Sequence, residues 1–148
     1  MKISIGCDHS ALDLKNVIIN HLKEKGHEVI DEGTYTKESC DYTDFGYKVA
    51  KDVQQGVAER GIVICFTGIG MSMIANKVKG VRCALVCNKD AAQLTREHND
   101  SNCLALSAKY TGLAFAKEIV DVWLNTEFSH NERHQRRIDK ITKYEEEF

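Results

Sequence analysis

The chain has 148 residues, with 20 lysines and arginines against 22 acidic residues, and a formal net charge of -2. This length suits one domain with its own hydrophobic core, and the balanced charge argues against bulk nucleic-acid binding. No apolar run approaches the roughly 20 residues of a membrane span, so we expect no membrane partner. Met1 leads directly into a strand-like segment, which leaves no room for a signal peptide and predicts a cytoplasmic protein.

Strand-like and helix-like patterns alternate along the whole chain. Periodicity predicts strands at 2–7, 28–32, 61–66, 82–87 and 103–107, and helices at about 10–25, 42–58, 71–79, 89–98, 111–125 and 133–147. Such alternation gives right-handed βαβ crossovers, so we predict an α/β, Rossmann-like three-layer fold with about five parallel strands and an extra C-terminal helix. No proline, linker or repeat interrupts the chain, which predicts a single domain over residues 1–148.

The last predicted helix differs from the others because it is highly charged. Its apolar residues form only a narrow stripe, Ile138, Ile141 and Tyr144. A helix of this kind is marginal on its own, so we expect it to pack against a partner subunit.

The most informative segment is 61–72, a buried strand that ends in Cys65 and continues through a glycine loop into a helix. Ligands of open α/β sheets bind at the carboxyl ends of the strands, where helix N-termini present free N–H groups. A thiol there deprotonates more readily than a free cysteine. A Walker loop is excluded because no Gly-Lys-Ser/Thr follows, and Met73 replaces the third glycine of a dinucleotide fingerprint. A structural turn with a buried cysteine remains the alternative.

Other polar residues fall where they could join Cys65. Asp8 and His9 follow the first strand, so they could face the same crevice; equally, Asp8 could cap a helix and His9 could be an ordinary surface imidazole. His98 could complement a helix C-terminus or act as an acid/base. Arg133 and Arg137, four residues apart, could clamp a phosphate or form a solvated basic face.

Metal binding is not expected. The six cysteines are most simply reduced thiols. Cys83 and Cys87 would lie about 13 Å apart along one strand, too far to share a zinc ion. The segment 130–134 is similar to the zinc motif His-Glu-x-x-His, but its glutamate is one place too late.

Several short motifs, taken together, resemble the type B ribose-5-phosphate isomerase family. They are Gly-Cys-Asp-His at 6–9, Asp-Tyr at 41–42, Ile-Cys-x-Thr-Gly-x-Gly at 64–70, Ala-Asn-Lys at 75–77, Glu-His-Asn-Asp at 97–100 and Arg-His-Gln at 133–135. The resemblance implies a metal-free, cofactor-free aldose–ketose isomerase acting on a small sugar phosphate. It also implies a homodimer or homotetramer with its site at a subunit boundary.

The resemblance also implies roles for individual residues. Cys65 matches the base that moves a proton between C1 and C2, and His98 matches the residue that opens the sugar ring. Met71 stands where a subgroup without the cysteine carries a glutamate, which leaves Cys65 as the base. The implied substrate-binding residues are Asp8, His9, Phe66, Thr67, Gly68, Ile69, Gly70, Asn99, Lys109, Arg133 and Arg137.

Two positions depart from the family pattern. Phe66 replaces a glycine, which narrows the pocket mouth or changes substrate preference. Lys109 replaces an arginine, which keeps the charge but loses the bidentate fork. The alternatives are a hexose-6-phosphate isomerase of the same superfamily, acting on allose or galactose 6-phosphate, and a non-catalytic sugar-phosphate-binding module, against which the presence of both Cys65 and His98 argues.

Overall fold

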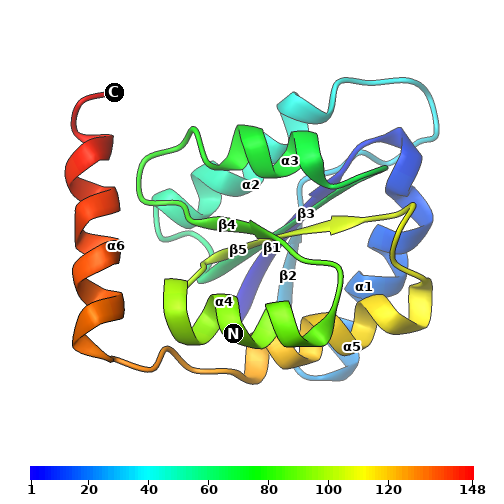
Figure 1. Cartoon of the computed structure of the whole chain (residues 1–148). Coiled ribbons are helices and arrows are strands. Elements are labelled where there is room, and N and C mark those ends of the chain that lie inside the picture. Colours follow the sequence, from blue (N-terminus) through cyan, green and yellow to red (C-terminus); the bar gives the residue numbers. More distant parts are fainter.

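The computed structural model describes residues 1–148, and the chain forms one sheet flanked by helices (Figure 1). The strands are β1 (Lys2–Cys7), β2 (Glu28–Asp31), β3 (Arg60–Cys65), β4 (Cys83–Leu85) and β5 (Cys103–Ser107). The helices are the 3-10 turn η1 (His9–Ala11), α1 (Leu12–Glu24), α2 (Tyr42–Gln54), α3 (Ile69–Ala75), α4 (Lys89–Asn99), α5 (Leu113–Asn125) and α6 (Glu132–Glu145). No helix is long and apolar enough to cross a membrane.

The five strands are all parallel and lie in the order β2-β1-β3-β5-β4. The predicted fold class is therefore confirmed. The chain first adds β2 on one side of β1 and then returns to add β3 on the other side. The carboxyl ends of β1 and β3 thus flank the point where the direction of winding reverses, which is where open α/β sheets form a ligand crevice.

Helices cover both faces of this sheet. In Figure 1, α2 and α3 lie above it, whereas α1, α4 and α5 lie below. Strand residues alternate between two cores: Ile62 and Ile64 face the lower helices, and Val63 and Cys65 face the upper ones. Both faces of the central strands β1, β3 and β5 are therefore dry, which is why β3 and β5 read as mostly apolar runs rather than alternating ones.

Two predicted boundaries were wrong near the edge strand. The helix predicted at 71–79 is α3, which begins at Ile69 and already ends at Ala75, and the strand predicted at 82–87 is shorter. The reason is Asn76, whose side chain donates to the Cys83 carbonyl at 2.9 Å and accepts from the Cys83 amide at 2.8 Å. The amide side chain takes the place of a further strand at the open edge, so neither element extends through it.

The helix α6 stands apart from the other layers, at the left of Figure 1. It contacts α4 in its own chain, and near its end the Glu145 carboxylate accepts a hydrogen bond from the Gly80 amide at 3.1 Å. Ile138 is buried, whereas Ile141 and Tyr144 stay largely exposed. Part of the predicted apolar stripe is therefore left uncovered by this chain.

A buried lysine anchors the loop that follows β2. Lys15 of α1 has no exposed surface, and its ammonium group lies 2.6 Å from Asp31 and 2.7 Å from the carbonyl oxygen of Thr34. The Asp31 carboxylate also accepts the Gly33 amide at 2.9 Å. This ion pair therefore connects the first helix to the backbone of the loop across residues 31–34.

We expect Lys15→Ala to lower the free energy of unfolding in urea by about 2–3 kcal/mol, because it leaves Asp31 and the Thr34 carbonyl without their donor. The expected loss is smaller than for a fully buried ion pair, because Asp31 is partly solvated. The matched control is Lys37→Ala, which removes an exposed ion pair to Asp13 at 3.2 Å and should cost less than about 1 kcal/mol. Equal losses in the two variants would contradict a structural role for Lys15.

Candidate functional site

The end of β3 brings a thiol and a backbone loop together, as the sequence predicts. Cys65 is only 5% exposed, and the Gly68 amide donates to its Sγ at 3.2 Å. Gly68 has φ of +78°, and a Cβ there would lie 2.5 Å from Cδ1 of Leu85 and 3.0 Å from the Leu106 carbonyl oxygen. Only glycine fits this turn, and the turn aims an N–H group at the sulfur.

The loop also leaves donors free beyond the sulfur. The short helix α3 begins directly after Gly68 and has no side-chain cap. The N–H groups of a first helical turn have no intrahelical acceptors, so those of Gly70 and Met71 can bind an oxygen atom beside Cys65. Met71 is fully buried, and its side chain packs against α2 close to Gly46.

The end of β1 lies directly beside the end of β3. The Asp8 amide donates to the Ile64 carbonyl at 3.3 Å, which places Asp8 next to the Cys65 strand. The Asp8 carboxylate accepts the amide of Ser10 at 3.0 Å and its hydroxyl at 2.5 Å. The capping role considered for Asp8 is therefore confirmed, and it holds the carboxylate at the crevice.

His9 is held by a residue far away in the sequence. Its Nδ1 accepts a hydrogen bond from the backbone amide of Cys40 at 3.2 Å, and the Cys40 thiol lies 3.8 Å from the same atom. His9 is only partly exposed. His9 is therefore a half-buried imidazole with a defined backbone partner rather than a freely exposed one.

Lys109 lies on the same side as the loop after Cys65. Its amide donates to the Phe66 carbonyl at 2.8 Å, and its Nζ lies 5.5 Å from the Phe66 ring centroid and 5.4 Å from that of Tyr110. Phe66 is 52% exposed at the mouth of the crevice. Phe66 and Lys109, the two residues that depart from the family pattern, are therefore in contact with each other.

Two residues of this crevice were not identified from the sequence. Tyr42, at the start of α2, covers Gly70 so closely that a Cβ on Gly70 would lie 2.6 Å from Cζ of the ring. Ser107, next to Cys65 in the sheet register, donates from its hydroxyl to the Phe66 carbonyl at 2.9 Å. The only sequence signal for Tyr42 was its place in a family motif, and Ser107 had none.

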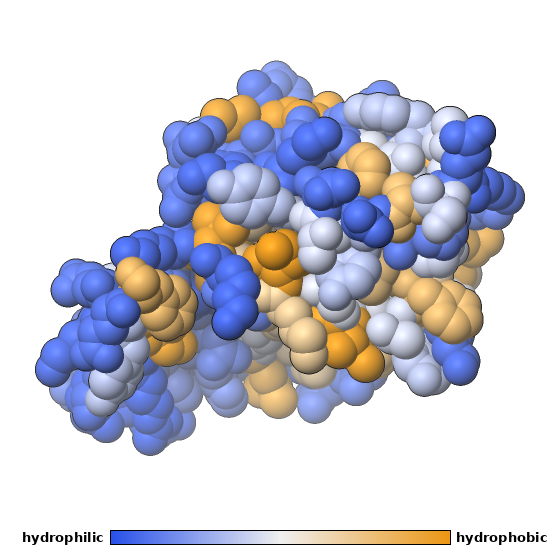
Figure 2. All heavy atoms as spheres, turned by 90° about the horizontal axis from the view of Figure 1, so that it is seen from above, coloured by the Kyte–Doolittle hydropathy of each residue, from blue (hydrophilic) through white to orange (hydrophobic).

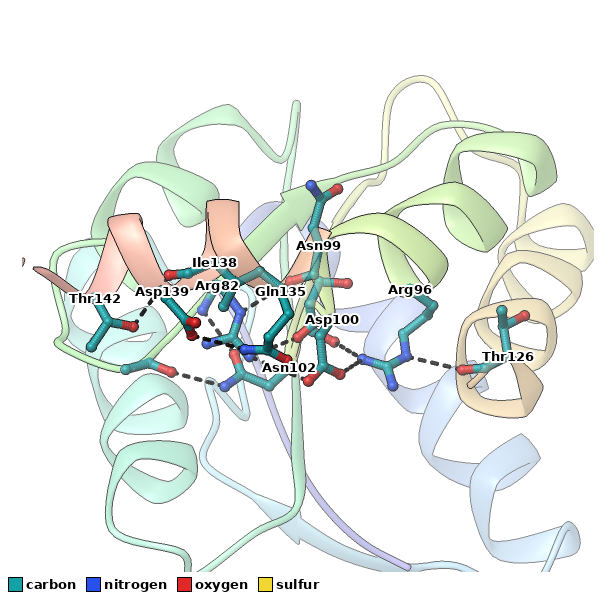
Figure 3. Close-up of polar contacts among 12 residues, drawn as sticks. Arg82, Arg96, Asn99, Asp100, Asn102, Thr126, Gln135, Ile138, Asp139 and Thr142 are labelled. Carbon is teal, nitrogen blue, oxygen red and sulfur yellow. Dashed lines mark hydrogen bonds and ion pairs between the residues drawn. The ribbon is translucent and has the colours of Figure 1, made fainter. Parts of the chain in front are cut away.

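The remaining predicted residues form a second group. His98, at the end of α4, stacks on His134 of α6 with ring centroids 4.4 Å apart. Arg133 and Arg137 lie one turn apart on α6, and both are exposed. The side chain of Asn99 points away from the neighbouring network of Arg82, Arg96 and Asp100, which ties the end of α4 to the rest of the chain (Figure 3).

The two groups do not meet within one chain. The second group belongs to the end of α4 and to α6, which lies on the opposite side of the molecule from the carboxyl ends of the strands in Figure 1. Gly61, at the amino end of β3, donates its amide to the Asn102 carbonyl just beyond α4, and Cys65 lies four residues further along the strand, about 13 Å away. A single chain thus presents two separate halves.

The positive charge of the second group comes from the guanidinium groups of Arg133 and Arg137. Burial lowers the pKa of His134, and the neighbouring His98, Arg133 and Arg137 lower it further because each disfavours a nearby positive charge. The two guanidinium groups near the stacked imidazoles therefore favour an anionic ligand. No three His, Cys, Asp or Glu side chains lie close enough together to hold a metal ion.

Comparison with known proteins adds direct relatives. The family model described as Ribose/Galactose Isomerase matches residues 3–141. The chain belongs to this family. A ribose-5-phosphate isomerase B of Escherichia coli strain K12 is 47% identical over 146 residues, which cover 98% of this chain and 97% of that protein.

Solved structures of the Ribose/Galactose Isomerase family agree with the fold. The ribose-5-phosphate isomerase B of Clostridium thermocellum has a TM-score of 0.97 at 51% identity and covers 99% of both chains. The corresponding enzyme of Mycoplasma genitalium, solved with bound ribulose-5-phosphate, has a TM-score of 0.95 at 44% identity and covers 99% of this chain and 97% of that one.

The stacked histidines give a test of the cationic group. Because the folded-state pKa of His134 is lowered, the unfolded chain binds more protons than the folded chain on acidification. The free energy of unfolding should therefore be unaffected by His134 well above about pH 6.5 and should fall as the pH drops below that value. His98→Gln should raise the pKa of His134, measured by NMR titration, and reduce the loss of stability between pH 7 and pH 5. His130→Gln, which removes an imidazole stacked edge-on against Phe128, is the control and should leave the titration unchanged. An unchanged His134 titration in His98→Gln would contradict the coupling.

Proposed function

We propose that this chain is an aldose–ketose isomerase that interconverts ribose 5-phosphate and ribulose 5-phosphate. The observation that carries the proposal is the Cys65 thiol, buried at the reversal point of the sheet with an amide donor 3.2 Å from its sulfur. Membership of the Ribose/Galactose Isomerase family supports the substrate class. The reaction transfers hydrogen within one molecule, so a hydride cofactor is not required.

The proposed reaction begins with the open-chain sugar. The Cys65 thiolate removes the proton from C2 of the aldose, the C–H electron pair forms a double bond between C1 and C2, and the carbonyl π pair moves onto the oxygen of C1, which gives the enediolate. The thiol then returns the proton to C1, while a proton passes from the C2 hydroxyl to the oxygen on C1, which gives the ketose. Atoms and charges balance without any co-reactant.

The loop after Cys65 is proposed to stabilise the negative oxygen of the enediolate. The free N–H groups at the start of α3 are fixed by the backbone, so they need no reorganisation as charge develops. One such donor is worth about 3 kcal/mol in other enzymes, whereas one pKa unit on a thiol corresponds to about 1.4 kcal/mol. The geometry of residues 66–70 should therefore matter as much as the base itself.

We further propose that the complete site contains residues of two chains in a cytoplasmic homodimer or homotetramer. His98 would open the sugar ring, and Asn99, Arg133 and Arg137 would bind the substrate, facing Cys65, Asp8, His9 and Lys109 of the partner subunit. The physical support is the separation of the two halves in one chain. The half that contains Cys65 carries the proposed base but lacks the arginine pair. The half that contains Arg133 and Arg137 carries the proposed phosphate-binding pair but lacks the base.

Uncovered apolar surface supports this arrangement. A cavity of about 480 Å³ lies between α6 and the edge of the sheet, lined in part by Val81, Ile141 and Tyr144. Figure 2 shows α6 as a projecting, mostly hydrophilic lobe, with hydrophobic atoms gathered in the notch beside it. Ile69 and Met73 of α3 are also 46% and 62% exposed. Burial of such surface against a second copy would stabilise a dimer.

The test of the function is turnover with chelator present, using ribose 5-phosphate, allose 6-phosphate and galactose 6-phosphate separately. We expect the pentose phosphate to give the highest kcat/KM. A higher value for a hexose phosphate would replace the substrate in the proposal, and Phe66 at the pocket mouth would be the first residue to examine. Absence of turnover on all three would favour a non-catalytic binding module.

Cys65→Ala should reduce kcat by a factor of about 10²–10⁴, the range lost with a general base, while KM and the fold change little. Cys87→Ala is the matched control, because Cys87 is an exposed thiol outside the crevice, and it should keep normal activity. Near-normal kcat in Cys65→Ala would exclude this residue as the base.

A mixing experiment tests the two-chain site. When inactive Cys65→Ala and Arg137→Ala chains exchange freely, half of the dimers are mixed and each carries one intact site, so about a quarter of the activity should return. Cys65→Ala mixed with Lys109→Ala is the control and should recover nothing, because both residues belong to the same half. Two affinity tags verify that mixed dimers form; no recovery in verified mixed dimers would contradict the proposal.

A further inference from the structure

The loop between β2 and α2 donates a backbone amide to a residue of the crevice. This loop, residues 32–41, connects the end of β2 with the start of α2. At its end the Cys40 amide donates to Nδ1 of His9 at 3.2 Å, across 31 positions of sequence. His9 itself follows Asp8, whose carboxylate fixes the turn η1. Both partners of the hydrogen bond are therefore attached to anchored backbone.

This contact determines which nitrogen of His9 carries the proton. In neutral imidazole one ring nitrogen is a donor and the other an acceptor, and the hydrogen bond made by one sets the role of the other. An Nδ1 that accepts from an amide N–H cannot carry a proton of its own. The proton of the neutral ring must then reside on Nε2, which is the nitrogen that the loop leaves free.

We propose that His9 acts in the crevice as a fixed, neutral Nε2–H donor to an oxygen of the sugar phosphate, and that the Cys40 amide is the positioning group that sets this tautomer. The inference rests on the proposed function for the identity of the ligand. It assigns His9 the role of a hydrogen-bond donor and excludes it as a general base, because its only free nitrogen already carries a proton.

The Cys40 thiol does not change this conclusion. Its sulfur lies 3.8 Å from the same Nδ1 atom. If Nδ1 carried a proton in order to donate to the sulfur, that proton would point at the amide hydrogen of Cys40. The stronger, shorter contact is the one from the amide, and a thiol that donates to Nδ1 would favour the same tautomer.

The position of the Cys40 amide is fixed from both ends of the loop. At the first end, Lys15 donates to the Thr34 carbonyl at 2.7 Å, and the Thr34 amide donates to the Cys7 carbonyl at 2.7 Å. At the other end, Asp41 immediately precedes α2, and its carbonyl accepts the Asp44 amide at 3.2 Å. The next residue, Tyr42, covers Gly70, so the segment that orients His9 also contacts the loop that follows Cys65.

The first experiment measures the tautomer directly and needs no substrate. The chain, labelled with ¹⁵N at its six histidines, is examined by long-range ¹H–¹⁵N NMR at about pH 8.5, where imidazole is neutral. The His9 signals are assigned from their loss in His9→Gln. We expect protonated Nε2 and bare Nδ1. Protonated Nδ1, or a mixture of tautomers, would overturn the proposal whatever the protein catalyses.

Variants of Cys40 separate the amide from the thiol. Cys40→Ala keeps the N–H group and should keep the Nε2–H tautomer, whereas Cys40→Pro lacks the N–H group and should show a mixture. Loss of the tautomer in Cys40→Ala would assign the effect to the thiol and overturn the role of the amide. If Cys40→Pro does not fold, the wild-type spectrum still determines the tautomer of His9, and the His9 variants still test its role as a donor.

The second experiment uses the two amide analogues of histidine. Gln places a donor near the position of Nε2, whereas Asn places its polar atoms near Nδ1. His9→Gln should stay within about threefold of the wild-type KM, and His9→Asn should raise KM about tenfold or more, as expected for loss of a hydrogen bond to a charged ligand. The reverse order, or equal effects, would contradict the donor role. Absence of wild-type turnover would refute the proposed function and leave the tautomer result valid.

Discussion

The reversal of winding between β1 and β3 is the constraint on which the crevice depends. Because the chain adds strands first on one side of β1 and then on the other, the two connections leave the sheet in opposite directions and a gap opens at the strand ends. Asp8 and Cys65 end these two strands, and the Asp8 amide bonds the carbonyl just before Cys65 at 3.3 Å. Any order that separated β1 from β3 would separate the carboxylate from the thiol.

Within this crevice, the backbone supplies several hydrogen-bond donors. Gly68 turns with positive φ against Leu85 and the Leu106 carbonyl, so no larger residue fits, and its amide reaches the sulfur of Cys65. The Cys40 amide similarly reaches His9. Backbone donors of this kind are fixed by the fold and lose no side-chain entropy on binding a ligand. The proposed enediolate would therefore meet donors that are already in place.

The cationic residues are placed by a different principle. The helix α6 buries little of its own surface, and its arginines stay exposed to solvent, where they could reach the proposed phosphate group. Its attachment depends on the contacts with α4, on the stacked pair His98 and His134, and on the Glu145 carboxylate at the Gly80 amide. A helix that carries exposed arginines yet leaves the apolar notch beside it uncovered fits the proposed role of completing the site of a second chain.

The sequence by itself determined the order of strands and helices, the α/β class, and the position of Cys65 at a strand end before a glycine turn, because hydrophobic periodicity and turn chemistry are local properties. Only the tertiary structure decided which strand ends are neighbours, that Cys40 contacts His9, that Tyr42 covers Gly70, and that His98 and the arginines of α6 lie away from Cys65. These relations join residues tens of positions apart. They follow from how the helices pack on both faces of the sheet, and this packing cannot be predicted from the pattern of any short segment.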